Sequence, residues 1–340
     1  MLVSMRDTDW DGVRLHVVTG KGGTGKTTVA AALALALASN GKPVLLMEVE
    51  GRQGIAQVFD VPPLPYEERR VAVAPADDGR PGGDVFALAV DPQSALIEYL
   101  EMFYNLRQAG RALTKLGVLD FATTIAPGLG DVLLTGKAAE AVRRKADGSP
   151  VYGAVVMDAP PTGRISRFLN VSSEVSGLAR VGPIRNHADT VQKVIRSAQT
   201  VVHFVALLEE MPVQETLDGI AELREIGKGG IQPGGIMVNM MRPSWPSTLG
   251  EAGTSGGDEA GLAELEASLK AVGLGDDVNL AADLAAELAD EARTEQTQLA
   301  QRKLLDAAGQ PCYELPLLTD GIDLAALYRL AAALREQGAA

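Results

Sequence analysis

The chain alternates between short apolar runs rich in Val, Leu and Ile and longer segments whose apolar residues recur at helical spacing. Short apolar runs bounded by turn residues are typical of strands in a parallel sheet that is buried on both faces. We expect these strands at Val13–Val18, Val44–Val49, Val85–Val90, Ala154–Met157, Val201–Leu208, Gly235–Asn239 and Cys312–Leu317. A helix over Thr27–Asn40 that ends at Gly41 joins the first two. The pattern predicts a Rossmann-like α/β fold, with helices flanking a mostly parallel sheet.

Two segments interrupt this alternation with extended helical spacing. Residues 92–150 and 168–199 predict an inserted helical subdomain over one end of the sheet, within a single domain spanning residues 1–340. Its apolar residues either line a groove or form ordinary core: Leu96, Leu100, Phe103, Leu113, Leu116 and Phe121. Residues 242–261 are rich in Gly, Pro and acidic residues, which predicts a mobile surface loop.

The net charge of −13 repels polyanions, and no basic segment offsets it, so we expect no nucleic-acid partner. The longest strictly apolar run, Val29–Ala38, is half the roughly 20 residues that span a membrane. The N-terminal residues lack the apolar region of a secretory signal. We therefore expect a cytoplasmic protein that is not integral to a membrane, although docking to a membrane partner stays open.

Cysteine and histidine are sparse. Cys312 is the single cysteine, so the chain forms no internal disulfide and supplies no Cys pair to a metal. We expect Cys312 to be a small buried core residue. His16 and His203 fall within strand patterns, which favours packing or hydrogen bonding inside the sheet over metal binding.

Candidate chemistry begins directly after the first predicted strand, where GKGGTGKTT satisfies the phosphate-loop pattern GxxxxGK[ST]. Glycines let backbone N–H groups close around phosphates, and the helix N-terminus adds positive potential. Lys26 would reach the β- and γ-phosphates, Thr27 would bind Mg²⁺, and Thr28 would contact the α-phosphate. We expect ATP or ADP with Mg²⁺ to bind at Gly20, Lys21, Gly22, Gly23, Thr24, Gly25, Lys26, Thr27 and Thr28.

Lys21 occupies a position that the basic pattern leaves free. One interpretation is a solvated loop lysine. The other is the deviant Walker A form, KGGTGKT, in which this lysine reaches the phosphates bound by a partner protomer. The second interpretation predicts a nucleotide-dependent dimer.

Acidic residues are expected beside the phosphates. Asp158, in VVMDAPPTG, ends a predicted strand and is placed to hold Mg²⁺ directly or through water. Hydrolysis also needs a group that activates water, and MEVEGRQG offers Glu48, Glu50 and Gln53. We choose Glu50, because it lies just beyond the strand, at the edge that opens onto the ligand crevice. A solvated loop acid is the alternative, and Glu48 would have a structural or supporting role.

These segments together resemble the ArsA and Get-type targeting ATPases, a family of deviant Walker A P-loop NTPases. Besides KGGTGKTT, the resemblance rests on DAPPTGRISRFL (158–169), TVVHFVALLEEMPVQET (200–216) and IMVNMM (236–241), and it spans most of the chain. It implies that Asn239 contacts adenine and that Pro316 closes the other side of the base. It also implies a slow ATPase switch whose dimer couples nucleotide state to a hydrophobic or membrane-protein client.

The chain departs from the family at several points. Where the family typically has STDPAH, this chain has EVEGRQ, so Glu50 replaces the water-activating Asp and Gln53 the histidine. The CxxC of the eukaryotic members is absent, so we predict no zinc, and one cysteine supports neither an iron–sulfur cluster nor arsenite stimulation. The altered segment leaves a second function open, that of a weakly catalytic subunit assembled with a related ATPase.

Overall fold

The structure, a computed structural model, describes residues 8–76, 79, 81–104, 127–170, 183–226, 230–242, 259–274 and 279–340. A single sheet organises these residues, with strand order β10-β9-β8-β1-β7-β2-β4-β3. Its strands are β1 (Leu15–Gly20), β2 (Val44–Glu48), β3 (Arg69–Val73), β4 (Asp84–Ala89), β7 (Ala154–Asp158), β8 (Thr200–Ala206), β9 (Pro233–Met241) and β10 (Cys312–Pro316). Among the strand pairs of this eight-stranded sheet, only β3 with β4 is antiparallel, so the predicted α/β fold with a mostly parallel sheet is confirmed.

The strands are apolar on both faces because helices cover both faces of the sheet. Along β2, Val44 and Leu46 point to one core, whereas Leu45 and Met47 point to the other. The first core is closed by α1 (Lys26–Ala38), α2 (Gly54–Val58) and α14 (Leu324–Glu336). The second is closed by α3 (Pro92–Tyr104), α6 (Pro127–Arg143), α7 (Thr162–Leu169), α9 (Pro183–Ile195) and α10 (Glu210–Glu225).

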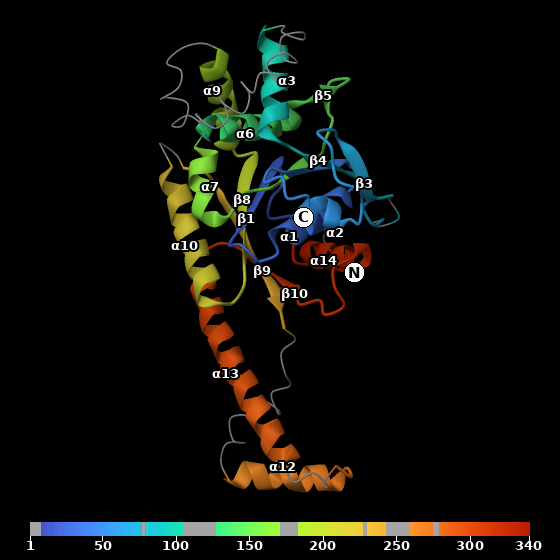
Figure 1. The fold of residues 1–340 in the computed structure, drawn as a ribbon, viewed down its shortest axis with the longest axis vertical. Coiled ribbons are helices and arrows are strands. Elements are labelled where there is room, and N and C mark those ends of the chain that lie inside the picture. The colour runs from blue at the N-terminus through green and yellow to red at the C-terminus, as the bar shows by residue number, and fades with distance from the viewer. Residues whose placement is uncertain are drawn as a thin grey trace, which may run out of the picture.

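Two groups of helices project beyond the sheet in opposite directions (Figure 1). At one end α6 packs on both α3 and α9. At the other end α13 (Leu280–Asp306) extends away from the sheet to α12 (Glu259–Ala271), which crosses its far end. Among the described helices none is both long and apolar enough to cross a membrane.

Within the predicted helical ranges the structure describes α3, α6 and α9, with a short hairpin of β5 (Lys145–Ala146) and β6 (Ser149–Pro150) after α6, whereas α7 lies almost entirely before the second range. Of the apolar residues considered for a groove, Leu96 is buried in the second core. The side chains of Leu100, Leu113, Leu116, Phe103 and Phe121 lie outside the described residues. Most of the predicted 242–261 loop also lies outside them, and α12 begins at Glu259, inside that range.

The expected strands are confirmed to within two residues at each end, but β3 escaped prediction. Its five residues pair with β4 at the edge of the sheet and are half-buried or exposed, so they lack an apolar run. The prediction that Cys312 is a buried core residue is also wrong. Its side chain is half-buried, because β10 forms the opposite edge of the sheet.

His16 and His203 lie on the neighbouring strands β1 and β8 and are fully buried. The Gly235 N–H donates to His203 Nδ1 at 3.1 Å, so His203 carries its proton on Nε2 and donates to His16 Nδ1, also at 3.1 Å. Burial lowers the pKa of His16 to about 4 and the pKa of His203 well below its usual value. Both histidines are thus neutral structural residues, as predicted.

Candidate functional site

The phosphate loop joins β1 to α1 and needs glycine for two different reasons. At Gly20 a Cβ would overlap the Val205 carbonyl oxygen of the adjacent strand, so only glycine fits. At Gly23 and Gly25 the backbone is left-handed, with φ values of 90° and 84°. Gly25 is also the N-cap of α1, so the loop delivers the first turn of that helix, with Lys26, Thr27 and Thr28, directly to the site.

Asn239 supports this loop from β9. Its side-chain amide donates to the Thr24 carbonyl oxygen at 2.9 Å, while the Thr24 hydroxyl donates to the Lys21 carbonyl oxygen at 2.8 Å. Asn239 is buried, and a Cβ at Gly25 would overlap its amide nitrogen. Asn239 therefore holds the loop closed in this structure, and the adenine contact that the resemblance implies stays a prediction.

Asp158 lies at the end of β7 and meets the first turn of α1. The Thr27 hydroxyl donates to Asp158 Oδ2 at 2.6 Å. The pKa of Asp158 is raised to about 6, mainly by burial; the Thr27 hydrogen bond and Lys26 oppose this rise, and the nearby Glu48 and Glu50 add to it. The predicted hydroxyl and carboxylate are thus brought together beside Lys26, the arrangement that a hard cation and a phosphate require.

The acid that ends β2, Glu48, and the acid just beyond it, Glu50, have different surroundings. Glu48 is buried in register with Asp158, and one of its oxygens accepts from the Ile55 N–H at 3.1 Å. Its other oxygen is buried without a hydrogen-bond partner. Glu50 lies beyond the strand, half-buried, with a carboxylate oxygen 3.9 Å from Arg52. Glu48 thus supports the loop, as considered, while Glu50 stays the candidate for water activation.

A cavity of about 470 Å³ lies beside Asn239, at the carboxyl ends of β8 and β9. Its lining consists of Leu207, Leu208, Glu209, Glu210, Asn239, Met240, Met241, Arg242, Thr294, Thr297, Gln298 and Leu317. Sequence reasoning missed the contribution of α13, whose Thr294, Thr297 and Gln298 are remote in sequence from every motif. Leu317 lines the cavity, whereas Pro316 pairs with Met241 at the end of β10.

A known protein family matches most of the chain. The model of the anion-transporting ATPase (ArsA) family matches residues 13–226, which include the phosphate loop and Asp158. The chain belongs to this family.

Relatives of this ArsA-type chain differ in how much of their length it covers. It is 50% identical to ATPase BagA of Mycobacterium tuberculosis over 333 residues, which are 96% of this chain and 94% of BagA. It is 28% identical to an arsenical pump-driving ATPase of Acidiphilium multivorum over 62% of this chain and 36% of that protein. ATPase GET3 of Rhodotorula glutinis is 27% identical over 52% of this chain and 49% of GET3.

Within this single ArsA-type chain the extra loop lysine has an internal partner. Lys21 Nζ lies 3.2 Å from Glu215 Oε1 of α10, and both side chains are about one-third exposed, at 32% each. A half-exposed ion pair of this kind contributes little to stability, on the order of 0–1 kcal/mol. The lysine is therefore readily released toward another anion.

Both polar atoms of the Gln53 side chain form hydrogen bonds with the backbone of Leu64. Its amide nitrogen donates to the Leu64 carbonyl oxygen at 3.1 Å, and its amide oxygen accepts from the Leu64 N–H at 2.7 Å. Its own backbone is left-handed, with φ 57°, directly before α2. The residue that replaces the family's histidine thus fastens the loop after β2 to a segment eleven residues further along the chain.

The donor set fits Mg²⁺. Thr27 and Asp158 offer hard oxygen ligands, and the unpartnered Glu48 oxygen lies in the same buried region. With the Thr27 hydroxyl and the Asp158 carboxylate as ligands, the other coordination positions of Mg²⁺ would be filled by water and phosphate oxygens, which is how Mg²⁺ usually binds. Within the described ranges no three His, Cys, Asp or Glu side chains gather around a metal site.

Proposed function

We propose that this ArsA-type chain is a Mg²⁺-dependent ATPase that works as a dimeric switch. The observation that carries the proposal is the contact of Thr27 with Asp158 beside Lys26, at the glycine-capped start of α1. In that arrangement backbone amides and Lys26 bind the phosphates, and Thr27 and Asp158 hold Mg²⁺, which neutralises phosphate charge when bound. Glu50 would accept a proton from the attacking water.

The dimer part of the proposal rests on Lys21. Its ion pair with Glu215 is weak and solvent-accessible, so a triphosphate on a second protomer would compete for it effectively. Nucleotide binding and dimer closure would then favour one another. The partner is either a second copy or a related subunit, and the closed state would bind a hydrophobic or membrane-protein client.

ATPase assays on loop variants test the catalytic part. We expect Lys26→Ala and Asp158→Asn each to lower kcat by at least about 100-fold, since Lys26 would supply a positive charge to the transferring phosphoryl group and Asp158 would hold the Mg²⁺ that supplies the other. Lys21→Ala should lower activity relative to the wild type most strongly at high protein concentration, where the dimer forms, because Lys21 acts through the dimer. The exposed Lys42→Ala is the matched control and should retain full activity. Hydrolysis that survives both Lys26→Ala and Lys21→Ala would defeat the model.

A second candidate function is an assembly subunit that binds nucleotide but hydrolyses it poorly. Gln53 favours it, because both ends of its amide are bound to Leu64 and neither is free to orient water. Purified protein that binds ATP without turnover and gains activity with a related ATPase would support this function. Robust turnover as a homodimer would exclude it.

A client can be captured in the closed state. Glu50→Gln should slow hydrolysis and hold the ATP-bound form, so a pull-down with this variant in ATP should enrich the client. Recovery of a related ATPase subunit alone would count against the targeting role.

A further inference from the structure

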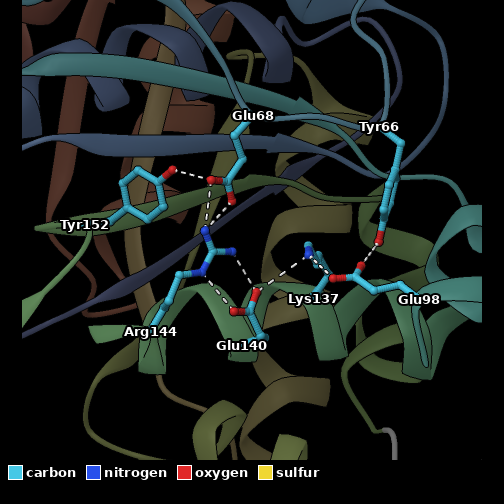
Figure 2. Close-up of polar contacts among 7 residues, drawn as sticks. All are labelled: Tyr66, Glu68, Glu98, Lys137, Glu140, Arg144 and Tyr152. Atoms are coloured by element: carbon cyan, nitrogen blue, oxygen red, sulfur yellow. Dashed lines mark hydrogen bonds and ion pairs between the residues drawn. The ribbon is translucent and has the colours of Figure 1, made fainter. Parts of the chain in front are cut away.

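A layer of charged and phenolic side chains connects the segment after Leu64 to the helices that project from the sheet (Figure 2). Hydrogen bonds and ion pairs join it in a row, in the order Tyr66, Glu98, Lys137, Glu140, Arg144, Glu68 and Tyr152. Cations and carboxylates alternate along the row, so each charge has an opposite neighbour. We call these seven residues the polar layer.

The segment after Leu64 enters this layer twice. The Tyr66 hydroxyl donates to Glu98 of α3 at 2.5 Å, and Lys137 of α6 lies 5.7 Å from the Tyr66 ring centroid. Two residues later, Glu68 accepts from Arg144, just beyond α6, at 2.9 Å. Charge-assisted bonds of this kind are short and directional, so movement of the segment is passed to both helices.

The same segment is fastened to the nucleotide site at its other end. Gly54 approaches Thr27 so closely that a Cβ there would lie 3.2 Å from Thr27 Cγ2. Gln53, the preceding residue, holds the Leu64 backbone with both ends of its amide. Thr27 is the residue that contacts Asp158, so a change at the candidate Mg²⁺ ligands would reach Gly54, which lies close to Thr27, and through the chain its neighbour Gln53.

We propose that Gln53 is a positioning residue which, through Leu64, Tyr66 and Glu68, transmits the nucleotide state to α3 and α6. The proposal rests on the proposed nucleotide-dependent function and specifies how the site is coupled to the helices. The links are the close approach of Gly54 to Thr27, the two Gln53–Leu64 hydrogen bonds, the short chain segment from Leu64 to Tyr66, and the Tyr66–Glu98 hydrogen bond.

The polar layer borders a cavity between the helices. A cavity of about 470 Å³ lies between α3, α6 and α9, and Tyr66, Glu98, Lys137, Glu140 and Arg144 form part of its wall. On its far side it is lined by Asn186, His187, Thr190 and Val191 of α9. Displacement of the polar layer would therefore change the shape of this cavity.

Hydrogen exchange with and without a nonhydrolysable ATP analogue and Mg²⁺ tests the coupling. In the wild type we expect the analogue to change exchange in peptides covering α3 and α6. Tyr66→Phe combined with Glu68→Gln should abolish that change while leaving the affinity for the analogue as in the wild type. Gln53→Ala should abolish it as well, and the triple variant should behave like either parent, because all three residues act on one route.

Tyr152→Phe is the matched control, since it removes one phenol–carboxylate hydrogen bond from Glu68 but leaves the Glu68–Arg144 ion pair and the Tyr66–Glu98 hydrogen bond in place. It should keep the wild-type response. An unchanged response in the Tyr66/Glu68 variant, equal loss in Tyr152→Phe, or a wild type that binds the analogue with no change in α3 and α6 would each overturn the coupling. A wild type that fails to bind the analogue would overturn the proposed function itself.

Discussion

Asp158 is a buried acid whose ionisation the native state disfavours, and replacing it with Asn should therefore stabilise the nucleotide-free protein. Burial raises its pKa from 3.8 to about 6. At about 1.4 kcal/mol for each pH unit, the ionised native state is destabilised by about 3 kcal/mol. Asn keeps an oxygen that accepts the Thr27 hydrogen bond but carries no charge, so Asp158→Asn removes this penalty.

The sign of the effect depends on pH. Between about pH 4 and pH 6 the native state binds more protons at Asp158 than the unfolded state does, so this residue makes stability fall as pH rises. The stability gained by Asp158→Asn should be near zero at pH 4, grow through this window, and stay constant at about 3 kcal/mol above pH 6. Other titrating groups are common to both proteins and cancel in the difference.

Urea unfolding of both proteins at a series of pH values, without nucleotide, measures this difference. Asp84→Asn is a suitable control, because Asp84 forms an exposed ion pair with Arg70 and should change stability by less than about 1 kcal/mol. A stability difference for Asp158→Asn that does not vary with pH would refute the argument. The same variant should lose Mg²⁺-dependent nucleotide binding, which separates a functional acid from a structural one.

Three further predictions concern the sheet and the loop. His16→Gln should flatten the wild type's loss of stability on acidification from pH 6.5 to about 4, because burial lowers the pKa of His16 and the unfolded state binds its proton first; urea unfolding measures this. Glu215→Gln should free Lys21 and raise affinity for ATP by up to about fivefold, as seen by titration with a fluorescent analogue, whereas unchanged affinity would argue against competition by Glu215. Gly25→Ala should destabilise the fold by at least about 1 kcal/mol and weaken nucleotide binding, since φ is 84° and the methyl group would displace Asn239; thermal unfolding and nucleotide titration check both effects.

The sequence predicted those features that depend on local pattern. Apolar runs such as Val44–Val49 locate the buried strands because both faces of the sheet are covered. The phosphate loop was predictable because its glycines and Lys26 have fixed spacing. Asp158 was predictable because it directly follows a buried apolar run, at the carboxyl end of a parallel strand, where ligands bind. The family followed from the same segments, and the match over residues 13–226 confirms it.

Features that depend on contacts between segments far apart in the sequence were not predicted. Edge strand β3 has no apolar run, yet it positions the residues just before it, including Tyr66 and Glu68. The lining of the cavity beside Asn239 by α13 depends on how a long helix packs, which periodicity alone does not determine. Lys21 illustrates the same limit, because its sequence position indicates a phosphate contact but not its resting partner, Glu215.

The departure of EVEGRQ from the family pattern gains a physical explanation from these contacts. A histidine at position 53 offers one donor and one acceptor at fixed ring positions, whereas the Gln53 amide presents both side by side and matches the N–H and C=O of a single residue. That match is what binds Leu64 in two places. The substitution therefore exchanges a group suited to water or proton transfer for one suited to mechanical connection. If this is correct, Gln53→His should weaken the nucleotide response of α3 and α6 more than it changes hydrolysis, whereas Glu50 variants should do the opposite.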